Sequence, residues 1–99
     1  MPVLLSAQNN LQNIRGTALD KLSQSPLIWA TVQVLNISES KGTSTDESGQ
    51  FVIFELAPQR YEIKVSYLGY KDVFIPNVVV TSGKEVILDI VMEEDLKIL

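Results

Sequence analysis

The amino-acid sequence predicts an all-β chain that folds as one seven-stranded antiparallel β-sandwich over roughly residues 12–92. Apolar and polar residues alternate with a period of two along several segments, as in strands that bury one face. Turn-forming residues separate these segments at intervals of roughly 8–12 residues, which is typical of sandwich proteins. No segment makes a convincing helix, so a parallel sheet with crossover helices is disfavoured.

The first two predicted strands lie in the first third of the chain. Residues 14–19 alternate in side-chain character and end at the turn-prone Asp20. The loop that follows contains Pro26, which has no N–H for strand pairing. Residues 28–34 place alternate apolar side chains on one face and Trp29 on the opposite face, so we expect the Trp29 side chain to be exposed.

The middle of the chain contains its strongest turn signal. A polar loop over residues 36–42 leads into a short strand at 43–45, and Asp-Glu-Ser-Gly follows at 46–49. Asp hydrogen-bonds its own backbone two residues on, and Gly accepts the positive φ that closes such a turn. Residues 51–56 are apolar on both faces, which predicts a central strand, and Ala-Pro-Gln at 57–59 ends it.

The last third of the chain shows the clearest alternation. Residues 61–67 place aromatic and aliphatic side chains on one face and polar ones on the other. After a bend at residues 69–70, extended structure resumes at 73–75, and a Pro-Asn turn leads into the segment 78–81. A Ser-Gly-Lys connection then leads into a final alternating strand at 86–92.

Composition limits the number of domains and excludes several classes of function. The 99 residues, 45% of them hydrophobic, suffice for one packed domain. The chain has no cysteine and no histidine, so disulfides, thiolate chemistry, Ser-His pairs and zinc–histidine sites are impossible within it. A formal net charge of −4 argues against nucleic-acid binding. No apolar run approaches the ~20 residues of a membrane-spanning helix, so we expect membrane contact only through a neighbouring domain.

Both ends of the chain are expected to lie outside the sandwich. Residues 1–12 are predicted to be a flexible lead, in which Leu4–Ala7 allow two interpretations: the end of a secretory signal peptide, or an ordinary lead-in. A complete signal also requires a basic region and a longer apolar segment. Residues 94–99 end on apolar side chains, which is unusual at a free terminus, and we interpret them as a linker to a downstream domain.

Short motifs recur in a fixed order between residues 14 and 93. Residues 16–20 match Gly-x-Val-x-Asp except for Ala at the third position, and residues 26–32 match Pro-Leu-x-x-Ala-x-Val. Residues 42–51 contain a complete Gly-x-x-Thr-Asp-x-x-Gly-x-Phe. With these motifs the chain resembles the carboxypeptidase regulatory-like domain. Two departures are Trp29, where the family commonly has Gly, and Gln59-Arg60, where a Gly often precedes the Tyr.

The resemblance implies a transthyretin-like sandwich of Ig-like Greek-key type over residues 13–93. The positions that carry the family's structural motif are Gly16, Asp20, Gly42, Thr45, Asp46, Gly49, Phe51, Tyr61, Gly69 and Tyr70.

Within this family, residues 66–70 and 79–84 resemble the extension that precedes the plug in TonB-dependent outer-membrane receptors of Bacteroidetes-type bacteria. That resemblance implies a non-catalytic accessory module on the periplasmic side of the cell envelope, whose partner is a protein: the rest of its own chain or an envelope protein. The alternatives are a structural domain attached to a metallo-carboxypeptidase or other hydrolase, and a cell-surface carbohydrate-binding or adhesive sandwich.

The acidic side chains do not form a pattern typical of catalysis or metal binding. Asp46 and Glu47 supply too few oxygen ligands for calcium, and an Asx-type turn explains them. Nothing in the spacing brings two carboxylates into one pocket, where their pKa values would separate. We therefore predict no enzymatic activity, no cofactor and no metal ion. The carboxylates considered were Asp20, Glu55, Glu62 and Asp89.

Three aromatic residues are candidates for a binding surface. Trp and Tyr are enriched at interaction hot spots because one rigid side chain buries a large area. Tyr67 belongs to the inward face of its strand and is predicted to be core, while Tyr70 follows Gly69 and is predicted to brace the bend. Trp29 points away from its apolar neighbours and is the candidate partner contact.

Overall fold

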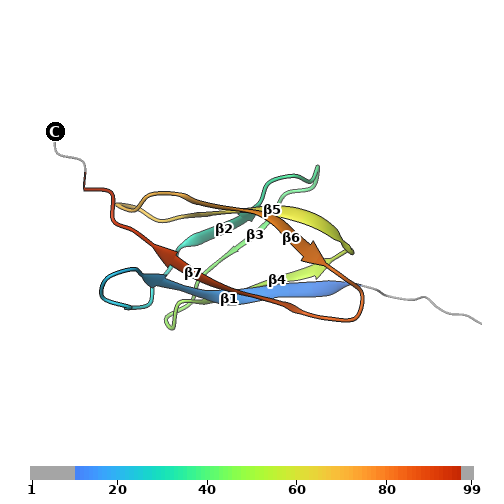
Figure 1. Ribbon diagram of the computed structural model, residues 1–99, viewed down its shortest axis with the longest axis horizontal. Coiled ribbons are helices and arrows are strands. Elements are labelled where there is room, and N and C mark those ends of the chain that lie inside the picture. Colours follow the sequence, from blue (N-terminus) through green and yellow to red (C-terminus); the bar gives the residue numbers. More distant parts are fainter. Residues whose placement is uncertain (1–10, 97–99) are drawn as a thin grey trace, which may run out of the picture.

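The computed structural model describes residues 11–96, which form seven β-strands and no helix (Figure 1). The positions Leu4–Ala7 and part of the expected linker at 94–99 lie outside the described residues, and Gln12, expected in the lead, begins the first strand. In chain order the strands are β1 (Gln12–Asp20), β2 (Thr31–Val34), β3 (Lys41–Ser44), β4 (Gln50–Leu56), β5 (Gln59–Ser66), β6 (Val73–Val80) and β7 (Val86–Met92).

The strands form two sheets that pack face to face (Figure 1), which confirms the predicted all-β sandwich. The three-stranded sheet has the order β4-β1-β7 and the four-stranded sheet the order β3-β2-β5-β6. The expectation of antiparallel pairing throughout was wrong for one pair, because β1 and β7 run parallel, with Ile14 opposite Val86 and Asp20 opposite Met92. A parallel pair requires a long connection, and here the five intervening strands supply it.

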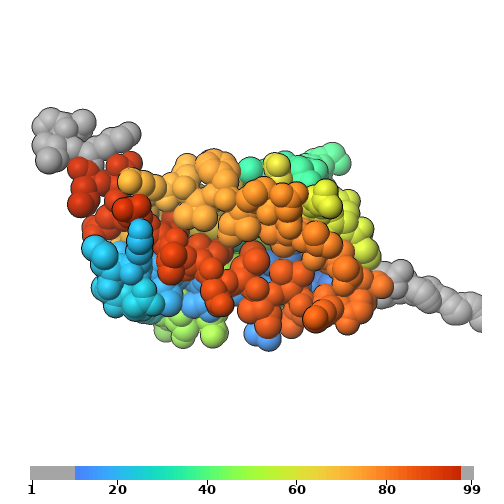
Figure 2. Space-filling model, in the orientation of Figure 1, coloured from blue at the N-terminus to red at the C-terminus, as the bar shows by residue number. Residues whose placement is uncertain are grey.

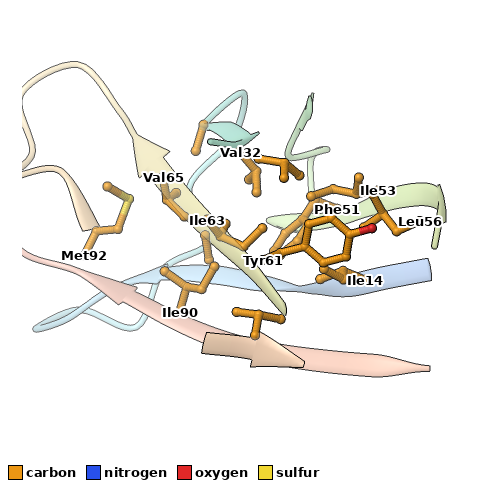
Figure 3. Close-up of a cluster of buried hydrophobic side chains, with 14 of the residues drawn as sticks. Ile14, Val32, Phe51, Ile53, Leu56, Tyr61, Ile63, Val65, Ile90 and Met92 are labelled. Atoms are coloured by element: carbon orange, nitrogen blue, oxygen red, sulfur yellow. The ribbon is translucent and has the colours of Figure 1, made fainter. Parts of the chain in front are cut away.

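The core lies between the two sheets and is built from alternate residues of both (Figure 3). The alternation predicted for residues 61–67 is observed as far as Val65, since Tyr61, Ile63 and Val65 are buried. Each fully buried Val, Ile or Leu side chain stabilises the fold by about 1.5–3 kcal/mol. The other buried hydrophobic residues are Ile14, Ala18, Leu27, Ala30, Val32, Val34, Phe51, Ile53, Leu56, Val78, Val80, Ile90 and Met92.

The prediction that residues 51–56 form a central strand was wrong. Strand β4 pairs with β1 alone among the described strands and lies at the edge of its sheet. Of the apolar residues on its outer face, Phe54 is 62% exposed, so its hydrophobicity does not reflect burial. At this edge Lys41 of β3 donates from Nζ to the carbonyls of Phe54 and Glu55 at 3.0 and 2.9 Å, which joins the two sheets.

The expected turn at Pro76-Asn77 is instead a bulge within one continuous strand, β6. Asn77 has a φ of 59°, and the pairing with β5 shifts register between Tyr61 and Ile63. β6 is one of the two edge strands of the four-stranded sheet, where a proline without an N–H is tolerated. Asn adopts the left-handed conformation more readily than other non-glycine residues, so the strand continues through the bulge.

The strand predicted at 28–34 begins only at Thr31. Trp29 has a φ of 68°, in the left-handed region, so the chain is not extended there. As a result Ile28 is 37% exposed and does not join the inward face that the alternation predicted for it.

Candidate functional site

The signature turn at residues 46–49 is closed by the side chain of Asp46. Its Oδ1 accepts hydrogen bonds from the backbone N–H groups of Ser48 and Gln50, both at 2.9 Å. Gly49 has a φ of 75° and donates its N–H to the Asp46 carbonyl at 3.0 Å. A Cβ at this glycine would lie 2.8 Å from the Ala18 carbonyl oxygen, so both conformation and space require glycine. The acidic turn is thus stabilised by its own backbone.

Thr45, directly before this turn, is completely buried and holds the segment that carries Trp29. Its hydroxyl donates to the Leu27 carbonyl and accepts the Ala30 N–H at 2.8 Å. Its backbone carbonyl accepts the Trp29 N–H at 3.1 Å, and its N–H donates to the Ala30 carbonyl at 2.9 Å. Thr45 belongs to the sequence motif, but its role in holding this segment has no local signal, since the partners of its hydroxyl are 15 to 18 positions away.

Asp20 and Tyr70, two further motif positions, form a second cluster at the end of β1. The Asp20 side chain accepts the Ser23 N–H at 2.7 Å, the Leu22 N–H at 3.0 Å and the Ser23 hydroxyl at 3.0 Å. The Tyr70 hydroxyl donates to the other carboxylate oxygen at 2.6 Å. Tyr70 therefore braces more than the local bend, because it joins the β5–β6 connection to β1.

This cluster shifts the acidity of both of its members. The Ser23 backbone N–H and then the Tyr70 hydroxyl hold the pKa of the Asp20 carboxyl at about 2, below its ordinary value of 3.8. The hydrogen bond to Asp20, together with burial and the nearby negative charge, raises the pKa of Tyr70 to about 12. Asp20 is thus held ionised and Tyr70 neutral across the physiological range, as in a structural pair rather than a proton-transfer pair.

The remaining motif residues also take structural places. Phe51 and Tyr61 are core residues, and the Tyr61 hydroxyl donates to the Ala57 carbonyl at 2.6 Å. Burial raises the pKa of Tyr61. Gly16 lies opposite both Phe51 and Leu88, Gly42 lies opposite Gln33, and Gly69 has a φ of 87°.

The other carboxylates do not converge on a catalytic centre. Glu55, Glu62 and Asp89 are exposed on three different strands. Within residues 11–96 no group of three or more His, Cys, Asp or Glu side chains is placed to hold a metal ion. Over the same range no helix has the length and apolar character needed to cross a membrane.

The exposed aromatic surface predicted around Trp29 is larger than one residue. The Trp29 side chain is 69% exposed and lies at one end of the four-stranded sheet, beside Leu68, which is 97% exposed. Thr31 and Ser66 are paired between them, and Tyr67 completes the lining. We call these five residues the Trp29 surface; none of them carries a charge at neutral pH.

Two members of this surface differ from the sequence-based expectation. Tyr67, predicted to be core, is only half-buried because β5 ends at Ser66, and its ring packs against Tyr70 with centroids 5.3 Å apart. Leu68 was not recognised as a candidate. A large apolar residue directly before the bend glycine was the available signal, but only the pairing of β2 with β5 brings it to Trp29.

Comparison with known proteins gives one family and several similar folds. The model of the carboxypeptidase regulatory-like domain matches residues 13–93. A comparison with curated protein sequences finds no match.

Among solved structures, chains of two mutant type II cohesin–X–dockerin complexes from Acetivibrio cellulolyticus are similar. The second is 25% identical, with a TM-score of 0.66 over 84% of this chain and 58% of that chain. The present chain spans 56% and 58% of those two chains. The 5-hydroxyisourate hydrolase of Klebsiella pneumoniae is 18% identical, with a TM-score of 0.65 over 85% of this chain and 92% of that chain. The group B streptococcus pilus 2b backbone protein is 13% identical, with a TM-score of 0.60 over 86% of this chain and 42% of that chain.

Proposed function

We propose that this chain, which belongs to the carboxypeptidase regulatory-like domain family, is a non-catalytic module that binds another protein surface through Trp29. We place it as the accessory extension of a TonB-dependent outer-membrane receptor, on the periplasmic side. The fold by itself is shared by enzymes and binding proteins, so the proposal rests on the site.

The observation that carries the proposal is the combination of strain and exposure at Trp29. A non-glycine residue in the left-handed region costs about 1–2 kcal/mol relative to the right-handed one. Trp29 has a φ of 68°, which explains why glycine suits this position. Because the Trp29 side chain stays 69% exposed, its burial offsets little of this conformational free energy. A strained residue that the surrounding hydrogen bonds hold in place is a candidate for function. Thr45 provides those hydrogen bonds here.

The chemistry of the Trp29 surface indicates the kind of partner. A rigid indole and the fully exposed Leu68 offer apolar area, and the hydroxyls of Thr31 and Ser66 offer hydrogen bonds without charge. This combination suits an uncharged, apolar protein segment, with Trp29 as the anchor.

The receptor context is supported by the position of one of the two segments that resemble the receptor extension. The segment 66–70, which resembles the receptor extension, supplies Ser66, Tyr67 and Leu68 of the Trp29 surface. The partner would then be the rest of the same polypeptide or a neighbouring envelope protein. In the structural-domain alternative, the same surface would instead face a hydrolase domain.

Site-specific photocrosslinking in the native full-length polypeptide tests the proposal. A photoreactive phenylalanine at Leu68 is expected to crosslink to a plug, barrel or other envelope protein in the membrane fraction, and Trp29→Ala is expected to abolish that crosslink. The matched control carries the same probe at Phe54, which is 62% exposed on the other sheet. Equal crosslinking from both positions, crosslinking to a soluble hydrolase domain, or retention in the Trp29→Ala background would overturn the proposal. Binding to a glycan array that depends on Trp29 would replace it with carbohydrate recognition.

A further inference from the structure

The chain enters and leaves the sandwich at opposite ends of one strand pair. β1 and β7 are neighbours in the three-stranded sheet and run parallel over seven consecutive pairs, from Ile14–Val86 to Asp20–Met92. The chain therefore enters at the Ile14 end and leaves past Met92 at the other end (Figure 1). Figure 2 shows the loop after β1 and the residues after β7, cyan and red, together at that second end.

Tension applied to the two ends of such a chain acts along the strands. The backbone hydrogen bonds of a parallel ladder are evenly spaced, and the pair extends over about 20 Å at the rise of a β-strand. When β1 is pulled one way and β7 the other, the bonds are loaded in shear and must break together rather than one after another. We propose that this domain has a force-bearing function, in which the parallel β1–β7 pair holds the fold closed under tension along the chain.

Contacts beyond the end of the ladder strengthen this pair. The Lys21 N–H donates to the Met92 carbonyl at 2.9 Å, which extends the ladder by one bond. The chain then crosses to the other sheet, where the Lys71 N–H donates to the Glu93 carbonyl and the Asp95 N–H donates to the Gly69 carbonyl, both at 2.9 Å. These bonds tie the exit segment to the β5–β6 connection, so they carry part of the tension that would otherwise act on β7 alone.

Gly16 shows how closely the two strands approach. It lies opposite Leu88, and a Cβ added at Gly16 would collide with the Leu88 backbone carbonyl. On its other side Gly16 lies opposite Phe51 of β4, so β1 is held between two strands. Any side chain at Gly16 must push β7 outward and weaken the ladder.

The direction of pulling provides a test that leaves the β1–β7 pair unchanged. The chain has no cysteine, so a single Gly83→Cys substitution gives a unique attachment point in the connection before β7. Nothing lies within 4 Å of an added Cβ at Gly83. The same 99-residue variant is stretched by single-molecule force spectroscopy, first through handles at its two ends, then between its N-terminal end and the introduced thiol. The second geometry opens the β1–β7 pair from one end.

End-to-end pulling is expected to need about twice the unfolding force of the second geometry, or more, at the same speed, because forced unfolding depends on the barrier that the force meets. Equal forces, or a lower force end to end, would overturn the proposal.

Two variants separate shear resistance from general stability. Gly16→Ala is expected to lower the unfolding force in end-to-end pulling. Val32 is buried in β2 of the other sheet, so Val32→Ala is expected to lower the thermal stability but to keep most of that unfolding force. If Val32→Ala lowers the force as much as Gly16→Ala does, resistance follows overall stability and the proposal is wrong. If Gly16→Ala does not fold, the comparison of the two pulling directions decides the question.

Discussion

The Tyr70 hydroxyl donates a hydrogen bond of 2.6 Å to the Asp20 carboxylate across 50 positions of sequence. This bond joins the end of β1, in one sheet, to the connection between β5 and β6, in the other. Because Asp20 also binds the loop that follows it, the pair holds three segments at the end where the chain leaves the sandwich.

Removing this bond should destabilise the domain. Tyr70→Phe keeps the ring and deletes the hydroxyl, so the Tm in thermal unfolding is expected to fall. Asp20→Asn should lower it further, because a neutral amide has one acceptor oxygen and cannot accept from the Leu22 and Ser23 N–H groups and from the Tyr70 hydroxyl at its two separate positions, and because the charge of the carboxylate is lost from all of these bonds. In a double-mutant cycle the free energy of unfolding that the double variant loses should be smaller than the sum of the losses of the two single variants. Additive losses would mean that the two side chains act independently.

The same pair makes stability depend on pH at both extremes. Folding lowers the Asp20 pKa from 3.8 to about 2, so its contribution is present above about pH 4 and is lost as pH falls toward 2. Folding raises the Tyr70 pKa from 10.0 to about 12, so its contribution is present below pH 10 and is lost as pH rises toward 12. Urea titrations across pH should show a smaller acid-side loss in Asp20→Asn and a smaller alkaline loss in Tyr70→Phe. If the free energy of unfolding of both variants varied with pH as it does in the parent protein, Asp20 and Tyr70 would not be the source of this pH dependence.

Backbone strain at Trp29 predicts an unusual order of stability. Trp29→Gly should be more stable than Trp29→Ala by about 1 kcal/mol, because alanine keeps the unfavourable left-handed conformation and glycine does not. The matched control is Leu68, which is also exposed and does not have a positive φ. There the order should reverse, with Leu68→Ala more stable than Leu68→Gly by about 0.5–1 kcal/mol. Chemical denaturation of the four variants measures both differences.

The buried hydroxyl of Thr45 should matter more than its methyl group. Thr45→Val keeps the shape but leaves the Ala30 N–H and the Leu27 carbonyl without this partner, which should cost about 1–3 kcal/mol. Thr45→Ser keeps the hydroxyl and loses one buried methyl group, at a cost of about 1 kcal/mol. In urea unfolding the parent protein should therefore be more stable than Thr45→Ser, and Thr45→Ser more stable than Thr45→Val. The reverse order would show that packing, not hydrogen bonding, holds the Trp29 segment.

Much of the fold could be predicted because its signals are local. The alternation in residues 61–67 was interpreted correctly up to Val65, and it failed at Tyr67 because the strand had already ended. The apolar pattern of residues 51–56 predicted the strand but not its edge position, since an exposed Phe54 and a buried one have the same sequence signature. At the candidate site, Trp29 was predicted to be exposed, whereas its strain and its neighbour Leu68 were not foreseen.

The sequence by itself determined that the chain is a succession of short strands, which residues of 61–65 face inward and that residues 46–49 form a turn, because alternation and Asx–glycine chemistry act between near neighbours. Only the tertiary structure decided that β1 and β7 run parallel, that Tyr70 reaches Asp20 and that Leu68 joins Trp29. These relationships depend on how two sheets pack and on the closure of long loops between them. No local pattern records that geometry, because its free energy is shared among contacts far apart in the chain.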